Sequence, residues 1–165
     1  MSRNFIIGIF AFLLLASAIM LFPSVSQTFG IGKPSEKIES FDIVTLRLSG
    51  MRFTTEYEIV MKGEDAEVTE YKIRYGKDKD KDKRVPEKKA VCNVDRVLKL
   101  LNDCELASWD GFVGNHPKGV KDGIMFSLKA TVNGSKKISA HGSENFPKHF
   151  REFRDGLNAL LRQNN

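Results

Sequence analysis

The stretch from Lys121 to Phe153 constrains the fold most, because all of its local signals agree. Apolar and polar residues alternate from Ile124 to Val132, which is the pattern of a half-buried strand. Asn133-Gly134 follows, and this pair favours a type I′ turn because both positions need a positive φ. The alternation resumes over 136–141. The stretch therefore predicts a β-hairpin, and we expect the rest of the domain to pack against it.

An amphipathic helix is predicted to follow this hairpin. The sequence 142–145 (GSEN) breaks the second strand, and either Ser143 or Asn145 can cap a helix. Pro147 suits a first helical turn, and Phe146 can pack on Phe150 across the cap. One helical face is apolar, made of Phe150, Phe153, Leu157, Leu160 and Leu161. We therefore expect a long final helix that lies across the sheet.

Three more strands are predicted earlier in the chain, over 43–48, 53–61 and 70–75. In the second, apolar and aromatic residues such as Tyr57 and Ile59 alternate with charged ones. In the third, residues 71, 73 and 75 are apolar and alternate with charged residues. The short turns between these strands predict an antiparallel meander, with a polar face held by cross-strand charge pairs. The expected fold class is α+β: an antiparallel sheet, made of a three-strand meander plus the C-terminal hairpin, packed against two helices and preceded by an N-terminal apolar helix.

The region 76–89 (GKDKDKDKRVPEKK) is predicted to be a solvated loop. Its Asp-x-Asp-x-Asp spacing resembles the start of a calcium-binding loop. Such a loop needs glycine at its sixth position and glutamate at its twelfth. Those positions hold Lys83 and Lys89, so a calcium site is not expected.

A first helix is predicted over 94–102, with Asn93 as its N-cap. Cys92 and Cys104 flank it. Twelve residues of continuous helix separate two α-carbons by about 18 Å, whereas a disulfide needs less than about 7 Å. Either the helix is shorter than predicted or no bridge forms, and two small buried thiols are the simpler interpretation.

The N-terminal segment predicts export or membrane attachment. Arg3 precedes 18 residues, 5–22, that carry no charge, and small residues follow at Ser24 and Ser26. This pattern fits a signal peptide with cleavage after Ser26, but the apolar run also approaches the length of a membrane span. We expect residues 1–26 to be a signal peptide or a membrane anchor, 27–40 a linker, and 41–165 a single domain outside the cytoplasm.

The composition and motifs exclude several classes of function. The charge is only +5, with 26 basic and 21 acidic residues, and there is neither an Arg-rich helix nor a zinc spacing. Nucleic-acid binding is therefore not expected. The chain has no P-loop, dinucleotide-binding fingerprint or nucleophile elbow, so no cofactor and no metal is expected.

The most suggestive residues for a binding site lie around the only tryptophan. The loop 106–118 (LASWDGFVGNHPK) combines turn formers with polar side chains. A possible ligand-binding rim comprises Trp109, Asp110, Asn115, His116 and His141. The alternative is that Trp109 anchors the loop on the core and the polar residues only make turns.

The C-terminal 60 residues resemble a group of uncharacterised bacterial exported proteins and lipoproteins. The matching residues are Trp109, Asp122-Gly123, Gly142, Asn145-Phe146-Pro147, Phe150 and Leu157. The resemblance implies a bacterial envelope setting and carries no assigned chemistry. The chain departs from the lipoproteins because no cysteine follows its apolar segment.

Three functional hypotheses follow. The first is a non-enzymatic envelope protein that binds a partner or ligand through the open sheet face or the loops around Trp109. A second is an inhibitor or immunity-type protein that uses an exposed sheet. A third is a small hydrolase that uses His116 or His141 with Asp110 or Asp122, which would require these side chains to lie within about one water of each other.

Overall fold

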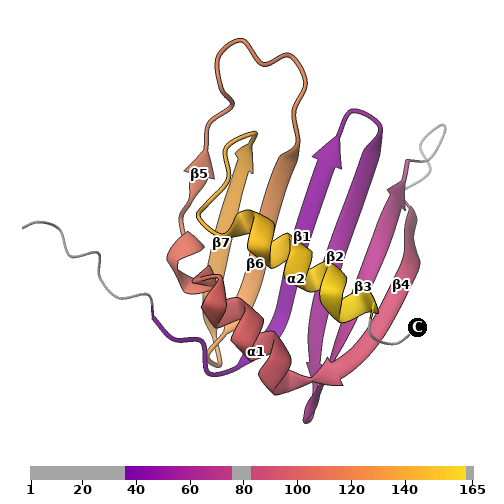
Figure 1. Cartoon of the computed structure of the whole chain (residues 1–165), viewed down its shortest axis with the longest axis vertical. Helices are drawn as coiled ribbons and strands as arrows, with labels where there is room; N and C mark the ends of the chain where they lie inside the picture. Colours follow the sequence, from indigo (N-terminus) through magenta and orange to yellow (C-terminus); the bar gives the residue numbers. More distant parts are fainter. Residues whose placement is uncertain (1–35, 76–82, 163–165) are drawn as a thin grey trace, which may run out of the picture. The chain divides into compact units, whose positions relative to one another are not determined.

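The structure, a computed structural model, describes residues 36–75 and 83–162. They form a seven-stranded sheet in the order β4-β3-β2-β1-β6-β7-β5, with two helices against one of its faces (Figure 1). All neighbouring strands are antiparallel except β5 and β7. The elements are β1 (Phe41–Gly50), β2 (Phe53–Lys62), β3 (Asp65–Arg74), β4 (Lys83–Asn93), α1 (Val94–Asp103), the 3₁₀ helix η1 (Leu106–Trp109), β5 (Val113–Gly114), β6 (Met125–Val132), β7 (Lys136–Ser143) and α2 (Phe150–Arg162). The predicted α+β class is confirmed.

The hairpin at the centre of the prediction is present as β6 and β7. Asn133 and Gly134 form its turn with φ values of 48° and 82°, as the Asn-Gly pair requires. On its other side β6 pairs with β1, which joins the hairpin to the N-terminal strands. The helix that follows begins later than predicted. Pro147 lies in a turn, where its carbonyl accepts a hydrogen bond from the Phe150 amide at 3.2 Å, and α2 starts at Phe150.

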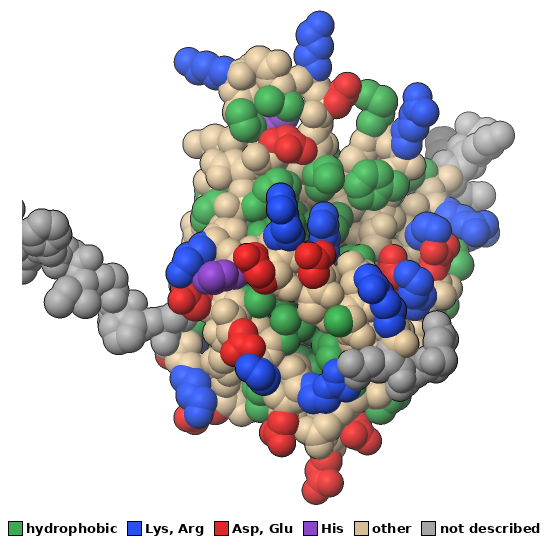
Figure 2. Space-filling model, viewed as in Figure 1, with side chains coloured by type: hydrophobic (Ala, Val, Ile, Leu, Met, Phe, Trp, Pro, Cys, Tyr) green, Lys and Arg blue, Asp and Glu red, His purple; other side chains and the backbone are tan. Residues whose placement is uncertain are grey.

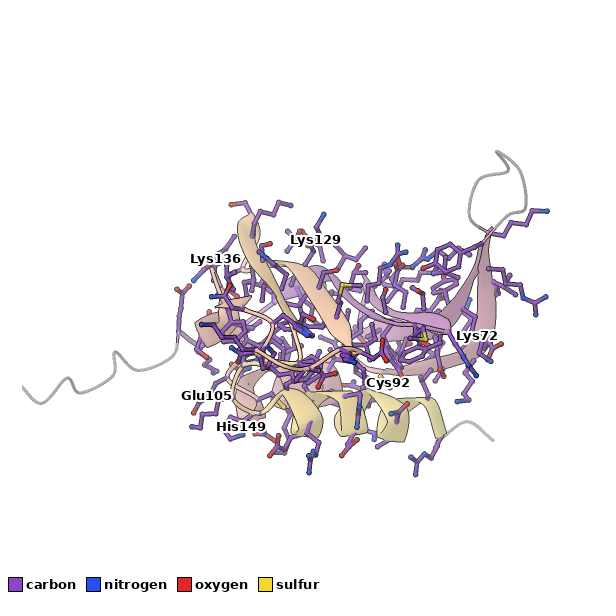
Figure 3. All side chains as sticks on the ribbon, turned by 90° about the horizontal axis from the view of Figure 1, so that it is seen from above. Lys72, Cys92, Glu105, Lys129, Lys136 and His149 are labelled. Atoms are coloured by element: carbon purple, nitrogen blue, oxygen red, sulfur yellow. The ribbon has the colours of Figure 1, made fainter. Side chains whose placement is uncertain are left out.

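Figure 3 views the sheet along its strands, with α2 below it and Lys129 on the opposite side. We call the uncovered side the open face. The core lies between the sheet and the helices, and Trp109 and Phe153 are both buried in it. Their rings meet edge to face at 5.5 Å, and Phe150 lies 6.0 Å from Trp109. This aromatic contact depends on α2, because both phenylalanines come from that helix.

The N-terminal half of the sheet, β1 to β4, has one strand more than the predicted three-strand meander. Residues 83–93 form β4, which pairs with β3 along its whole length, so the prediction of a solvated loop over 76–89 is wrong for 83–89. The other predicted loop residues, 76–82, lie outside the described residues. A β-bulge between Glu70 and Tyr71 allows Pro86 to fit opposite Tyr71. Proline and lysines are typical of an edge strand, because they prevent it from pairing with another chain. In the sequence the same residues suggested a loop, although they are compatible with a strand at the edge of a sheet.

The third strand also presents its faces differently from the expectation. Tyr71 pairs with Glu56, and Tyr57, which faces the helices, pairs with Glu70. Tyr71 and Ile73 therefore lie on the open face, while Glu70 lies on the helix side and bonds Lys88 at 2.9 Å. Alternation reveals that a strand has two different faces, but only the register with its neighbours decides which one is buried.

The first helix follows the prediction closely. The side chain of Asn93 caps α1 by accepting the Asp95 amide at 2.8 Å. Cys92 and Cys104 are both free thiols, Cys104 being buried. Burial raises the pKa of Cys104 to about 11, which makes this thiol a poor nucleophile.

The folded domain begins before the predicted boundary at Phe41. Ile38 is only 2% exposed and belongs to the core. Its amide donates to the side-chain oxygen of Asn102 at 2.9 Å, and its carbonyl accepts from the same side chain at 2.8 Å. The side chain of Asn133 accepts from the amides of Glu39 and Ser40. Two asparagine side chains thus attach residues 37–40, predicted as linker, to the domain.

The predicted apolar segment 5–22 lies outside the described residues. Neither α1 nor α2 has the length and apolar character needed to span a bilayer, and the same holds for all helical residues that the structure describes.

Candidate functional site on the open face of the sheet

Trp109 lies in the core and not at a surface rim. Its side chain is 1% exposed, so it anchors the loop, as the alternative interpretation proposed. Its indole N–H is buried with no hydrogen-bond partner in the described part of the chain. Trp109 therefore contributes packing and cannot touch a ligand at the surface.

Asp110 closes part of the exposed edge of β7. Its carboxylate accepts the Ser139 amide at 3.0 Å, and the Gly111 amide donates to the Ser139 carbonyl at 2.9 Å. A side chain thereby takes the place of a neighbouring strand. This arrangement protects an edge that would otherwise pair with another chain, so Asp110 has a structural role.

His116 ties the long loop between β5 and β6 to β7. Its Nε2 lies 2.8 Å from the carbonyl oxygen of Val120, so Nε2 carries the proton and donates. Its Nδ1 lies 2.8 Å from Oγ of Ser143 and accepts from that hydroxyl when the ring is neutral. His141 lies on the open face beside Val113, and Asn115 is exposed in the loop. Asp110 and His116 thus each hold a loop against β7, and the predicted residues do not converge on one rim.

The residues of the proposed hydrolase do not form a catalytic pair. No ion pair joins His116 or His141 to Asp110 or Asp122 in the described ranges. Ser143 and His116 are in contact, but the second ring nitrogen of His116 faces a backbone carbonyl rather than a carboxylate. The arrangement lacks the group that would stabilise an imidazolium during nucleophilic catalysis.

The half of the open face formed by β2, β3 and β4 is neutralised internally. Arg84 lies over the ring of Tyr71 at 3.6 Å and pairs with Glu56 at 2.7 Å and Glu58 at 2.8 Å. These pairs hold the pKa of Arg84 above its ordinary value, against the opposing effect of burial, which is the largest single contribution. Lys89 pairs with Glu67 at 2.9 Å. Charge pairs across strands were predicted, and the structure confirms them.

The other half of the open face, formed by β1, β6 and β7, holds a hollow that is not neutralised. We call it the open-face hollow, and it has a volume of about 470 Å³. The register places its six outward-facing side chains on the same side of the sheet. They are Ile43, Thr45, Lys129, Thr131, Lys137 and Ser139.

The two lysines of the open-face hollow have no carboxylate partner among residues 36–75 and 83–162. Lys137 donates to Oγ1 of Thr131 at 2.8 Å, and Lys129 makes no described side-chain contact. Three hydroxyl groups from three strands surround them. The arrangement offers two positive charges and several neutral donors, which is the chemistry that recognises an anion. Sequence reasoning missed it because its residues come from strands that are far apart in the chain.

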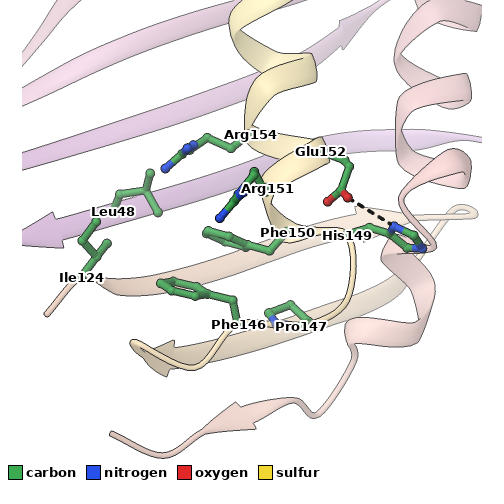
Figure 4. Close-up of a pocket in the computed structure, with 9 residues that line it drawn as sticks. All are labelled: Leu48, Ile124, Phe146, Pro147, His149, Phe150, Arg151, Glu152 and Arg154. Carbon is green, nitrogen blue, oxygen red and sulfur yellow. Dashed lines mark ion pairs between the residues drawn. The ribbon is translucent and has the colours of Figure 1, made fainter. Parts of the chain in front are cut away.

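A second hollow, of about 350 Å³, lies on the helix side beside the start of α2 (Figure 4). Its wall is apolar, formed by residues such as Leu48, Ile124 and Phe146. Arg151 and Arg154 lie at its margin, and His149 faces Glu152 at 4.0 Å. Its apolar wall is continuous with the aromatic core, so we regard it primarily as a consequence of packing.

No set of side chains in the described part of the chain could hold a metal ion. Comparison with protein-family models, curated proteins and solved structures finds no match.

Proposed function

We propose that the protein is a non-enzymatic binding module whose open sheet face takes an anionic ligand. The open-face hollow with its unneutralised Lys129 is the observation that carries the proposal. The helices cover one face of the sheet, and the charges on the other half of the open face are paired. The unpaired positive charge of the open face therefore lies in the half that is also hollowed.

The chemistry of the hollow favours a carboxylate or phosphate group. A volume of about 470 Å³ is sufficient for a small ligand or one side chain of a partner. Lys129 and Lys137 provide charge, and Thr45 and Ser139 provide hydroxyl donors. Ile43 offers an apolar contact beside them, so a ligand that carries both an anionic and an apolar part fits best.

The test is an NMR titration with inorganic phosphate and with acetate as probes. We expect the amide signals of Thr45, Lys129 and Ser139 to shift together and saturably. Replacing both lysines, as Lys129→Gln with Lys137→Gln, should weaken binding by at least about tenfold, because each lysine contributes a separate charge-assisted contact.

Lys89→Gln is the matched control. Lys89 also lies on the open face but already pairs with Glu67, so its loss should leave probe binding unchanged. If the double lysine variant binds the probes as the wild type does, or if the shifts spread evenly over all surface lysines, the proposed site is wrong.

We also propose that the module acts in a bacterial envelope. The basic start, the apolar run 5–22 and the resemblance of the last 60 residues support this location. A reporter enzyme that folds only outside the cytoplasm, fused after Asn165, should be active. Activity that survives deletion of residues 5–22 would contradict the proposal.

A further inference from the structure

Exposed apolar side chains gather at one end of the sheet. Of the seven large hydrophobic side chains that are exposed in the described ranges, five lie at the end where β1 meets β2 and where β6 begins. They are Met51, Phe53, Tyr75, Val120 and Met125, between 39% and 73% exposed. The register brings them together, because Ser49 pairs with Met125 and the hydroxyl of Tyr75 lies 2.5 Å from that of Thr54.

The same end carries a strong excess of positive charge, so we call it the basic end. It comprises residues 50–54, 72–75, 83–84, 115–125 and Glu144. Its side chains without an ion pair include five basic ones and two acidic ones. The basic ones are Arg52, Arg74, Lys83, Lys118 and Lys121, and the acidic ones are Asp122 and Glu144, whose carboxylate accepts the Ile124 amide.

The opposite end of the sheet has a smaller, acidic excess. Six acidic residues lie there, Glu36, Glu39, Asp42, Glu64, Asp65 and Asp95, against Lys37, Lys62, Arg96 and Lys136. On the helix side shown in Figure 2, basic side chains predominate at the top and acidic ones at the bottom, with some side chains of the opposite sign at each end. The domain is therefore electrically polarised along its strands, which would orient it at a charged surface.

We propose that the basic end docks on the anionic surface of a lipid bilayer. The turn between β1 and β2 places Met51 and Phe53 on either side of Arg52, so apolar groups can enter the headgroup region while the guanidinium remains at the phosphates. Apolar exposure alone would also suit a protein partner. The combination with unpaired cations, and with an acidic far end, favours a broad anionic surface. Each lysine or arginine near such a surface raises binding by about fivefold.

The experiment uses the full chain reconstituted in vesicles of phosphatidylcholine, with or without phosphatidylglycerol. Met51→Trp introduces a reporter at the tip of the basic end, and acyl chains that carry bromine quench any tryptophan that reaches them. Trp109 is 1% exposed and supplies a constant background. We expect Trp fluorescence from position 51 to be quenched and shifted to the blue only when phosphatidylglycerol is present, and salt of about 0.5 M should reverse both changes.

Two matched variants separate docking from simple tethering by residues 5–22. Val91→Trp places the reporter at a side chain that is 50% exposed but lies toward the acidic end, and it should not be quenched. Arg52→Glu with Lys118→Glu, in the Met51→Trp chain, should reduce binding of the basic end by more than about tenfold, whereas Arg96→Glu on α1 should not. Equal quenching at positions 51 and 91 would overturn the proposal. Quenching at position 51 that is the same with and without phosphatidylglycerol would also overturn it.

Discussion

Gly142→Ala tests the close approach of three backbone segments at the end of β7. A Cβ on Gly142 would lie 2.5 Å from the carbonyl oxygen of Asn145 and 2.9 Å from Cα of Gly114, its parallel neighbour in β5. It would also lie 2.8 Å from the ring of Phe126. Two of these three obstacles are backbone, so no side-chain rotation can relieve them.

The expected cost follows from these distances. Overpacking of this kind costs about 1–3 kcal/mol, and we expect the upper part of that range because a backbone oxygen is the closest obstacle. A Gly→Ala change regains about 0.4–1 kcal/mol through the unfolded chain. The free energy of unfolding should therefore fall by about 2 kcal/mol.

Urea denaturation followed by the fluorescence of Trp109 measures this change, because Trp109 is the only tryptophan and is buried. Gly119→Ala is the control, since a Cβ there meets no atom within 4 Å and only the φ of 85° is unfavourable. That strain costs about 1–2 kcal/mol when it is fully maintained, and an exposed loop can relax it. A Gly142→Ala protein that is as stable as the wild type would show that the three segments are not in contact.

Three further predictions concern the rest of the domain. Asn102→Ala loses the hydrogen bonds to both backbone groups of Ile38 and gains helix propensity, so unfolding should become easier by about 1–2 kcal/mol, and hydrogen exchange of the Ile38 amide should accelerate. The pKa of Cys104 is raised from 9.0 to about 11, so its contribution to stability is complete below pH 9 and is lost as the pH rises toward 11, because the unfolded thiol releases its proton first. The denaturation midpoint should fall less over this pH range in Cys104→Val. A slope should remain from Cys92 and Tyr57, because burial raises the pKa of both. Arg84→Ala should change the free energy of unfolding by less than about 1 kcal/mol, because its ion pairs are partly exposed, and a larger loss in the same urea assay would contradict this.

The elements predicted correctly are those whose signals are local. Asn133-Gly134 dictates a turn whatever surrounds it, and Asn93 caps α1 through an amide two residues away. The amphipathic pattern of α2 likewise needs no partner to be recognised. The start of α2 was predicted too early because its local signal is incomplete. Pro147 suggested a first helical turn, but its carbonyl accepts the Phe150 amide in a separate turn that precedes α2.

The elements predicted wrongly depend on pairing between distant segments. Residues 83–89 look like a loop because an edge strand carries lysines and proline to prevent further pairing. The domain boundary was placed too late because Ile38 is held by Asn102, which lies 64 residues away. A pattern within one segment contains no information about such contacts.

The same limit explains why the sequence directed attention to the loop around Trp109 and not to the open-face hollow. Trp109, Asp110 and His116 are neighbours in the chain, and their polar groups suggested a rim. In the structure all three have structural roles. Trp109 is buried in the core, and Asp110 and His116 form hydrogen bonds with β7. Thr45 and Lys129 are separated by 84 positions and become neighbours only because β1 inserts between β2 and β6. A binding role for this domain is therefore better sought where long-range pairing leaves a charge without a partner than where polar residues cluster in the sequence.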